Sequence, residues 1–260
     1  MSHISLIDTS STKKVEEIDI SRVNIEIDIE PGDVKIDDKI FAPMIDKCEL
    51  IGSILMTADS INIDYADEVD PVFLCCPTGG IPFATMLTEH ITIPEIIITS
   101  IKLQSYCGLE CTGTVQIQNE IDVDVRGKTV FVVDDLIDTG GSGERIGEYL
   151  MSKEAKKIVF VSMLFKEGAY SRHHMERNYK YCTLNTIEYP GIKINDEFVV
   201  GKGLDYNGKG RNLQGIYVLK TKNHPDKNDR IKPKSLCNSK YKQRYSTYVN
   251  KLLLHDINTL

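Results

Sequence analysis

The chain has 260 residues, 41% of them hydrophobic, and a formal net charge of −7, which suits one large domain or one domain with extensions. It contains no apolar run of the roughly 18 residues that a transmembrane helix needs, and its N-terminus lacks the basic and apolar segments of a secretory signal. The seven cysteines form no small-scaffold pattern, so we expect reduced thiols and a cytoplasmic protein without membrane contact.

The predicted elements begin with an N-terminal arm, residues 1–40, in which alternation from Val23 to Ile29 predicts a half-buried strand. Apolar spacing predicts helices at 42–60, 81–91 and 144–153, whereas 171–181 is expected to be irregular. Continuous apolar runs predict buried strands at 72–76, 96–103, 130–133 and 157–165, followed by short strands at 198–200 and 215–219. Strands that alternate with helices predict an α/β fold with a parallel, doubly wound sheet.

Residues 220–260 form a basic C-terminal extension. From Lys220 onward the chain has ten Lys or Arg and three Asp, a local charge of +7, so the remainder carries −14. The acidic body argues against general nucleic-acid binding. Tyr241, Tyr245, Tyr248 and Leu252 recur at helical spacing, and we favour a packing extension over a membrane or nucleic-acid contact.

Two turns carry the residues suited to an anionic, sugar-bearing ligand. After the run 130–133 come Asp134, Asp135 and Asp138, then a loop from Thr139 to Gly143. Loop glycines let backbone N–H groups approach phosphate oxygens, a following helix adds its positive end, and carboxylates accept hydrogen bonds from ribose hydroxyls. An ordinary βα turn with acidic residues near a helix start would explain Asp135 and Asp138 alone equally well.

The second turn, Pro77–Gly80, follows the strand at 72–76 and is also compatible with phosphate, although a tight turn without a ligand explains a Gly-Gly pair better. The stretch Gln104–Glu120 is expected to be a loop or hairpin. Its Ser105 and Tyr106 suit a lid that excludes water, or an incidental tyrosine in a hairpin.

The string Asp134, Asp135, Asp138, Thr139, Gly140 and Ser142 resembles the phosphoribosyl-diphosphate signature of type I phosphoribosyltransferases, two acidic residues before D-T-G-x-[ST]. From about Phe41 to Leu219 the chain is similar to the hypoxanthine-guanine branch of that family. The further matches are Pro77–Gly80, Ser105-Tyr106, Phe198–Gly201 and Leu204–Tyr206. The resemblance implies a core at 41–219, a doubly wound parallel sheet, and a small hood formed by N-terminal and C-terminal segments, including about 167–205.

The resemblance also implies an activity: transfer of 5-phosphoribosyl from phosphoribosyl diphosphate to hypoxanthine, guanine or xanthine, with release of diphosphate. It implies Mg²⁺ as cofactor and a homodimer or homotetramer. The implied sugar-phosphate residues are Asp134 and Asp135 for ribose, Asp138 and Thr139, Gly140, Gly141 and Ser142 for the 5′-phosphate, and Thr78, Gly79, Gly80 and Arg211 for diphosphate. The implied base and metal residues are Asp138 as general base, Lys166, Phe198 and Val199 for the purine, Ser105 and Tyr106 as lid, and Asp205 for the metal.

Four positions depart from that family pattern. Thr78, Gln104 and Glu197 stand where Lys is common, and Lys202 replaces a usual aromatic. The missing positive charges leave two alternatives open. One is a non-catalytic, phosphoribosyl-diphosphate-sensing regulator whose basic tail contacts a partner or nucleic acid. The other is a transferase for a different base.

Overall fold

The computed structural model describes residues 14–15, 27–28, 31–105 and 115–221. These residues divide into two compact units. The larger unit takes Ile51–Asp196, and the smaller takes the described residues up to Leu50 together with those from Glu197 onward. Among the described helices, none combines the length and the apolar character needed to cross a membrane.

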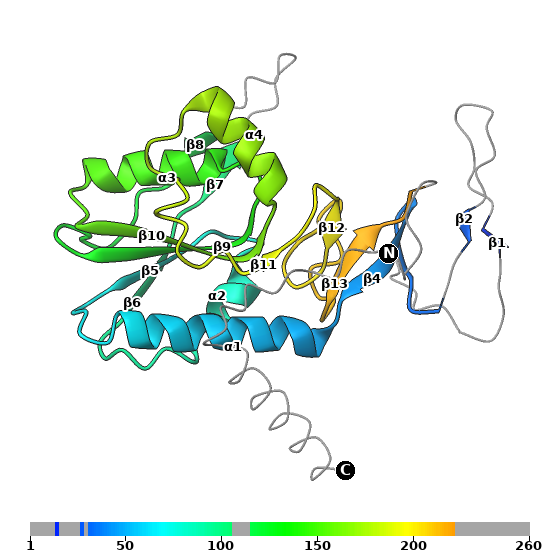
Figure 1. The fold of residues 1–260 in the computed structure, drawn as a ribbon, viewed down its shortest axis with the longest axis horizontal. Coiled ribbons are helices and arrows are strands. Elements are labelled where there is room, and N and C mark those ends of the chain that lie inside the picture. The colour runs from blue at the N-terminus through cyan, green and yellow to red at the C-terminus, as the bar shows by residue number, and fades with distance from the viewer. Residues whose placement is uncertain (1–13, 16–26, 29–30, 106–114, 222–260) are drawn as a thin grey trace, which may run out of the picture. The chain divides into compact units, whose positions relative to one another are not determined.

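The larger unit is built on a five-stranded parallel sheet in the order β11-β10-β9-β5-β6 (Figure 1). Its strands are β5 (Val72–Cys75), β6 (Ile97–Ser100), β9 (Thr129–Ile137), β10 (Lys157–Phe165) and β11 (Ile192–Lys193). β9 lies at the centre and pairs with β5 on one side and β10 on the other. The predicted α/β class with a doubly wound parallel sheet is confirmed.

Burial explains why β9 takes this central place. Its first five residues, Thr129–Val133, are buried, as an uninterrupted apolar run predicts for a strand covered on both faces. Phe131 stacks on Phe73 at 4.7 Å between ring centroids and meets Tyr65 edge-on at 4.8 Å. β9 is longer than predicted, because it continues through Asp134 and Asp135 to Ile137.

Helices cover both faces of the sheet (Figure 1). They are α1 (Lys47–Asp64), α2 (Ile81–Thr88), α3 (Gly141–Ser152) and α4 (Glu167–Arg177). In Figure 1, α1 and α2, in blue and cyan, lie on one side and α3, in green, on the other. α3 docks through Ile146 and Leu150, which are buried one turn apart on the same helix face.

Two helix predictions were wrong. The segment 42–60 is not one helix, because residues up to Ile45 belong to strand β4 (Lys39–Ile45) and α1 begins only at Lys47. The segment 171–181 is not irregular, because α4 reaches Arg177 and ends at Asn178 with a positive φ of 50°. α4 was missed because only Ala169 and Tyr170 of its side chains are buried, so its sequence shows no apolar stripe.

The smaller unit is an antiparallel sheet of four strands in the order β12-β13-β4-β3. β3 (Val34–Ile36) and β4 come from the N-terminal part of the chain, and β12 (Val199–Val200) and β13 (Ile216–Leu219) from the C-terminal part. Val34, Ile36, Phe41 and Val200 form its buried core. A buried ion pair of 2.9 Å joins Lys220 to Asp33.

Two short antiparallel pairs complete the described elements. β7 (Leu103–Ser105) pairs with β8 (Val115–Ile117), which confirms a hairpin within 104–120. β1 (Lys14–Val15) pairs with β2 (Ile27–Asp28). The rest of the strand predicted from Val23 to Ile29 lies outside the described residues.

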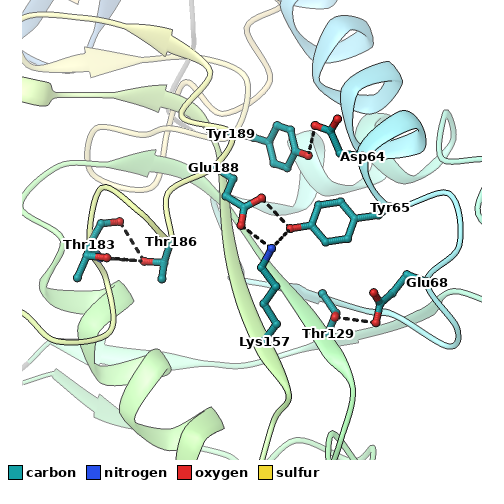
Figure 2. A network of polar contacts seen from close by, with 9 residues as sticks. All are labelled: Asp64, Tyr65, Glu68, Thr129, Lys157, Thr183, Thr186, Glu188 and Tyr189. Carbon is teal, nitrogen blue, oxygen red and sulfur yellow. Dashed lines mark hydrogen bonds and ion pairs between the residues drawn. The ribbon is translucent and has the colours of Figure 1, made fainter.

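A polar network joins the end of α1 to the start of β10 and to the segment before β11 (Figure 2). The Tyr65 hydroxyl donates to Glu188 at 2.7 Å and accepts from Lys157 at 2.6 Å, and Lys157 also pairs with Glu188 at 2.8 Å. Burial raises the pKa of Tyr65 to about 12. A second tyrosine, Tyr189, donates to Asp64 at 2.9 Å. Burial also raises the pKa of Tyr189, so both phenols stay protonated, and they crosslink the end of α1 to β10 and to the segment before β11.

Tyr65→Phe is expected to lower the free energy of unfolding by about 1–3 kcal/mol, because it removes two hydrogen bonds to charged groups in a buried position. Urea denaturation followed by circular dichroism measures this change. Tyr181→Phe is the matched control, since no hydrogen bond from the Tyr181 hydroxyl to another described residue is present. An equal loss in both variants would contradict a role for the network.

Candidate functional site

The carboxyl end of β9 gathers the predicted sugar-phosphate residues of the larger unit. Asp134 and Asp135 lie in the last part of β9, and Asp138 follows its final residue. We call Thr139–Gly143 the glycine loop. It turns into α3 at Gly140, whose φ of +84° lies in the left-handed region that glycine tolerates best.

The start of α3 offers free backbone donors. Gly140 is its N-cap and supplies no side-chain hydrogen bond, so the first N–H groups of the helix lack the usual capping oxygen. A cavity of about 90 Å³ lies at this point and is lined by Asp134, Asp138, the whole glycine loop, Cys182 and apolar side chains. Uncapped N–H groups at the positive end of a helix are suited to an anion, and the Thr139 and Ser142 hydroxyls could add further donors.

Within the acidic pair of Asp134 and Asp135, the pKa of Asp134 is shifted. Burial, reinforced by the neighbouring Asp135 carboxylate, raises the pKa of Asp134 well above its ordinary value. The Asp135 N–H donates to the Asp134 carboxylate at 3.0 Å. A carboxyl held in this way can both accept and donate hydrogen bonds, as recognition of vicinal hydroxyls requires.

The turn Pro77–Gly80 lies directly against this acidic pair. A Cβ on Gly79 would fall 1.9 Å from the Asp135 carboxylate, and one on Gly80 would fall 2.5 Å from the Cys76 carbonyl. The turn leads into α2, whose N-cap Gly80 also supplies no side-chain hydrogen bond. The uncapped starts of α2 and α3 therefore lie on either side of Asp134 and Asp135. Position 79 requires glycine, because a side chain there would collide with the Asp135 carboxylate.

Lys166 occupies the corresponding position after β10. Its N–H donates to the Ile137 carbonyl at 2.9 Å, and its ammonium binds the Asp138 carboxylate at 2.7 Å. Asp196 lies at 3.8 Å from the same ammonium and is paired with Arg172. Only 9% of the Lys166 side chain is exposed, so these two carboxylates are the near partners of an ammonium group that solvent barely reaches.

The predicted residues from Phe198 onward belong to the smaller unit. Phe198 is 47% exposed, with its ring 6.3 Å from that of Phe41 and 5.9 Å from that of Tyr206. Val199 is buried and pairs with Val218. The structure thus places Phe198 as a supported, half-open aromatic ring, a form suited to stacking on a flat ligand.

Asp205 and Arg211 form an ion pair of 2.6 Å in the same unit. Asp205 also accepts a hydrogen bond from the Gly208 N–H at 2.6 Å. Within the part of the chain that the structure describes, no group of three or more His, Cys, Asp or Glu side chains could enclose a metal ion. A single carboxylate such as Asp205 fits a Mg²⁺ ion that is held mainly by substrate phosphates and water, which is its common mode in phosphate chemistry.

The predicted lid falls at the margin of the described residues. Ser105 is the last residue of β7, and Tyr106 lies outside the described residues. Two neighbours of the site were not predicted, namely Cys182 in the cavity wall and Asp196 beside Lys166. Neither stands in a recognisable motif, so only the fold reveals them.

Comparison with known proteins points to one family. The model of the phosphoribosyl transferase domain matches residues 48–207. A hypoxanthine-guanine phosphoribosyltransferase of Streptococcus pneumoniae is 33% identical over 159 residues, which cover 60% of this chain and 81% of that protein. A hypoxanthine phosphoribosyltransferase of Salmonella typhimurium is 29% identical over 171 residues, 65% of this chain and 90% of that protein.

A solved structure shows the same similarity in three dimensions. The crystal structure of a hypoxanthine-guanine phosphoribosyltransferase from Bacillus anthracis superposes with a TM-score of 0.58 at 30% identity. The match covers 70% of this chain and 99% of that one.

Asp134→Asn is expected to stabilise the ligand-free protein at neutral pH. Because the folded-state pKa of Asp134 is raised, ionisation favours the unfolded chain as pH rises above the ordinary value of 3.8. The melting temperature of the variant should exceed that of the wild type by about 3 °C or more at pH 7, the shift that roughly 1 kcal/mol gives in a protein of this size.

Thermal melts followed by circular dichroism from about pH 3 to about pH 8, a range that runs from below to well above the ordinary pKa of an aspartate, test this. The advantage should shrink toward the acidic end, where Asp134 is protonated in both states. The exposed Asp67 provides a control, Asp67→Asn, with no such trend. A constant or inverted difference would show that Asp134 is not destabilised by ionisation.

Proposed function

Because the chain belongs to the phosphoribosyltransferase domain family, we propose that it transfers 5-phosphoribosyl from phosphoribosyl diphosphate to a 6-oxopurine and releases diphosphate. Hypoxanthine, guanine and xanthine are the proposed acceptors. The names of the relatives support purine salvage. The observation that carries the proposal is the ion pair of Asp138 and Lys166 beside the uncapped start of α3.

The sugar-phosphate roles follow from the chemistry of each group. Asp134 and Asp135 would hold the ribose hydroxyls. The backbone from Asp138 to Ser142, with the Thr139 and Ser142 hydroxyls, would bind the 5′-phosphate at the positive end of α3. Thr78, Gly79, Gly80 and Arg211 would bind the diphosphate. The close fit of Gly79 against Asp135 supports a ribose and a diphosphate that are adjacent.

The proposed base roles fall on Lys166 of the larger unit and on Phe198 and Val199 of the smaller one. Lys166 would donate to the exocyclic oxygen of the purine, Phe198 would stack on the ring, and Val199 would offer backbone groups to its edge. In the ligand-free chain the Lys166 ammonium donates a hydrogen bond to the Asp138 carboxylate. When the base binds, Lys166 would donate to the base instead. The Asp138 carboxylate would then be free to accept a proton from the purine nitrogen.

In the proposed reaction a purine ring nitrogen forms a bond to C1′ while the bond from C1′ to the diphosphate oxygen breaks. The electron pair of that bond leaves with diphosphate, and the proton of the purine nitrogen moves to Asp138, the general base. Mg²⁺, held by Asp205 and the diphosphate, would neutralise charge on the leaving group. Ser105 and Tyr106 would exclude water from the positively charged sugar. We propose a homodimer or homotetramer as the assembly.

A panel of free purine and pyrimidine bases with phosphoribosyl diphosphate and Mg²⁺ tests the activity. We expect diphosphate release with hypoxanthine, guanine or xanthine, at turnover numbers of about 1–1,000 per second, the common range for enzymes. Absence of nucleotide product from all three purines would refute the proposal. Tight binding of phosphoribosyl diphosphate without any turnover would favour the sensing regulator instead.

Asp138→Asn is expected to lower kcat by about 100-fold or more, the usual contribution of a general base. Asp196→Asn is the matched comparison, because it removes a charge from beside the same lysine without removing the proposed base. We expect it to lose far less. Steady-state kinetics with hypoxanthine measure both, and full activity in Asp138→Asn would remove Asp138 as the base.

A further inference from the structure

The side chains of Tyr170, Tyr179 and Cys182, which were not predicted as site residues, pack against the glycine loop. We call these three side chains the wall. A Cβ on Gly140 would come within 2.9 Å of the Tyr170 ring and 3.2 Å of the Tyr179 ring, and one on Gly141 would lie 3.4 Å from the Tyr179 hydroxyl. A Cβ on Gly143 would lie 2.6 Å from the Cys182 sulfur. The loop is therefore pressed against residues from α4 and from the segment that follows it.

The segment 180–182 is held in place by one carboxylate. Glu144, in the first turn of α3, accepts three backbone hydrogen bonds: from Lys180 at 2.9 Å, Tyr181 at 2.8 Å and Cys182 at 2.8 Å. Tyr170 fastens the same segment from the other side, because its hydroxyl donates to the Cys182 carbonyl at 2.8 Å. Charge-assisted bonds of this kind are stronger than neutral ones.

Two glycines on α3 let this segment approach closely. Gly143 and Gly147 are four residues apart and share a helix face. A Cβ on Gly147 would come within 2.4 Å of the Tyr181 Cβ. The backbone of 181–182 therefore packs directly on the helix, which brings its N–H groups within reach of Glu144.

The position of Glu144 also matters for charge. It lies in the turn whose N–H groups face the cavity, where an uncompensated carboxylate would repel a phosphate. Its two oxygens instead accept N–H groups of another segment. The Glu144 carboxylate thus holds residues 180–182 in place, and the N–H groups of those residues compensate much of its negative charge.

We propose that Glu144 is a positioning residue for the 5′-phosphate: by holding residues 180–182 on α3, it fixes the wall that sets the shape of the glycine loop. This inference takes the identity of the ligand, a sugar phosphate, from the proposed function. Glu144 itself does not contact the ligand. Glu144 acts through Cys182 and Tyr179, which pack against the loop glycines Gly140, Gly141 and Gly143.

Calorimetric titration of the full chain with ribose 5-phosphate tests the proposal without any turnover. Glu144→Ala is expected to weaken binding about tenfold, the scale of losing one charge-assisted hydrogen bond. Glu144→Gln, which keeps one acceptor oxygen, should weaken it less. Glu148→Ala is the control, since Glu148 is exposed on the same helix and pairs with Arg145; its affinity should match the wild type.

Kinetics separate positioning from simple loss of fold. With phosphoribosyl diphosphate and hypoxanthine, Glu144→Ala should raise the KM for phosphoribosyl diphosphate about tenfold and change kcat less than about threefold. A drop in kcat alone, as expected from partial unfolding, would overturn the inference. If Glu144→Ala does not fold, Glu144→Gln and Gly147→Ala carry the same comparison, and unchanged affinity in both overturns it.

The outcomes distinguish this inference from the proposed function. Unchanged ribose 5-phosphate affinity in folded Glu144→Ala overturns the inference even where the wild type makes nucleotide. A graded loss from Glu144→Gln to Glu144→Ala supports it even where no purine is turned over. A wild-type chain that binds no ribose 5-phosphate overturns the inference, whereas the base panel decides the transferase activity separately.

Discussion

The register of β9 against its two neighbours is the constraint on which the candidate site depends. Cys75 of β5 lies level with Val133, and Phe165 of β10 lies level with Ile137. Because parallel strands end at the same edge of a sheet, the segments that follow them meet there. The Gly79 turn therefore touches Asp135, and Lys166 reaches Asp138. A slip of one residue would turn each of these side chains to the opposite face.

This arrangement resolves an apparent conflict of charge. The proposed substrate carries several phosphate charges, yet the site presents Asp134, Asp135 and Asp138. Burial keeps the pKa of Asp134 high, and Lys166 pairs with Asp138. Backbone N–H groups at the uncapped starts of α2 and α3 contribute positive potential as well. Such fixed dipoles need no lysine side chain, so Thr78 at a position where Lys is common is compatible with anion binding.

The sequence predicted best what depends on local pattern. The continuous apolar runs located β5, β9 and β10, and the glycines after them located the turns, because both signals arise within a few residues. The prediction failed at β4 and α4. Ala42 to Ile45 was assigned to a helix although it pairs with β13, a long-range partnership that no local pattern reveals. α4 shows no apolar stripe because most of its surface is exposed.

The same reasoning explains why the sequence offered the proposed site residues and not the residues that pack against them. Asp134, Asp138 and Gly140 stand in a motif along one turn, which sequence reading can recognise. Glu144, Tyr170 and Cys182 act across the fold through backbone groups, and any segment with three free N–H groups in line would serve Glu144 equally well. Such a partner carries no sequence signature. The glycines of the loop therefore have two reasons to be small. Under the proposal they would admit a ligand from one side, and on the other side they already pack closely against Tyr170, Tyr179 and Cys182.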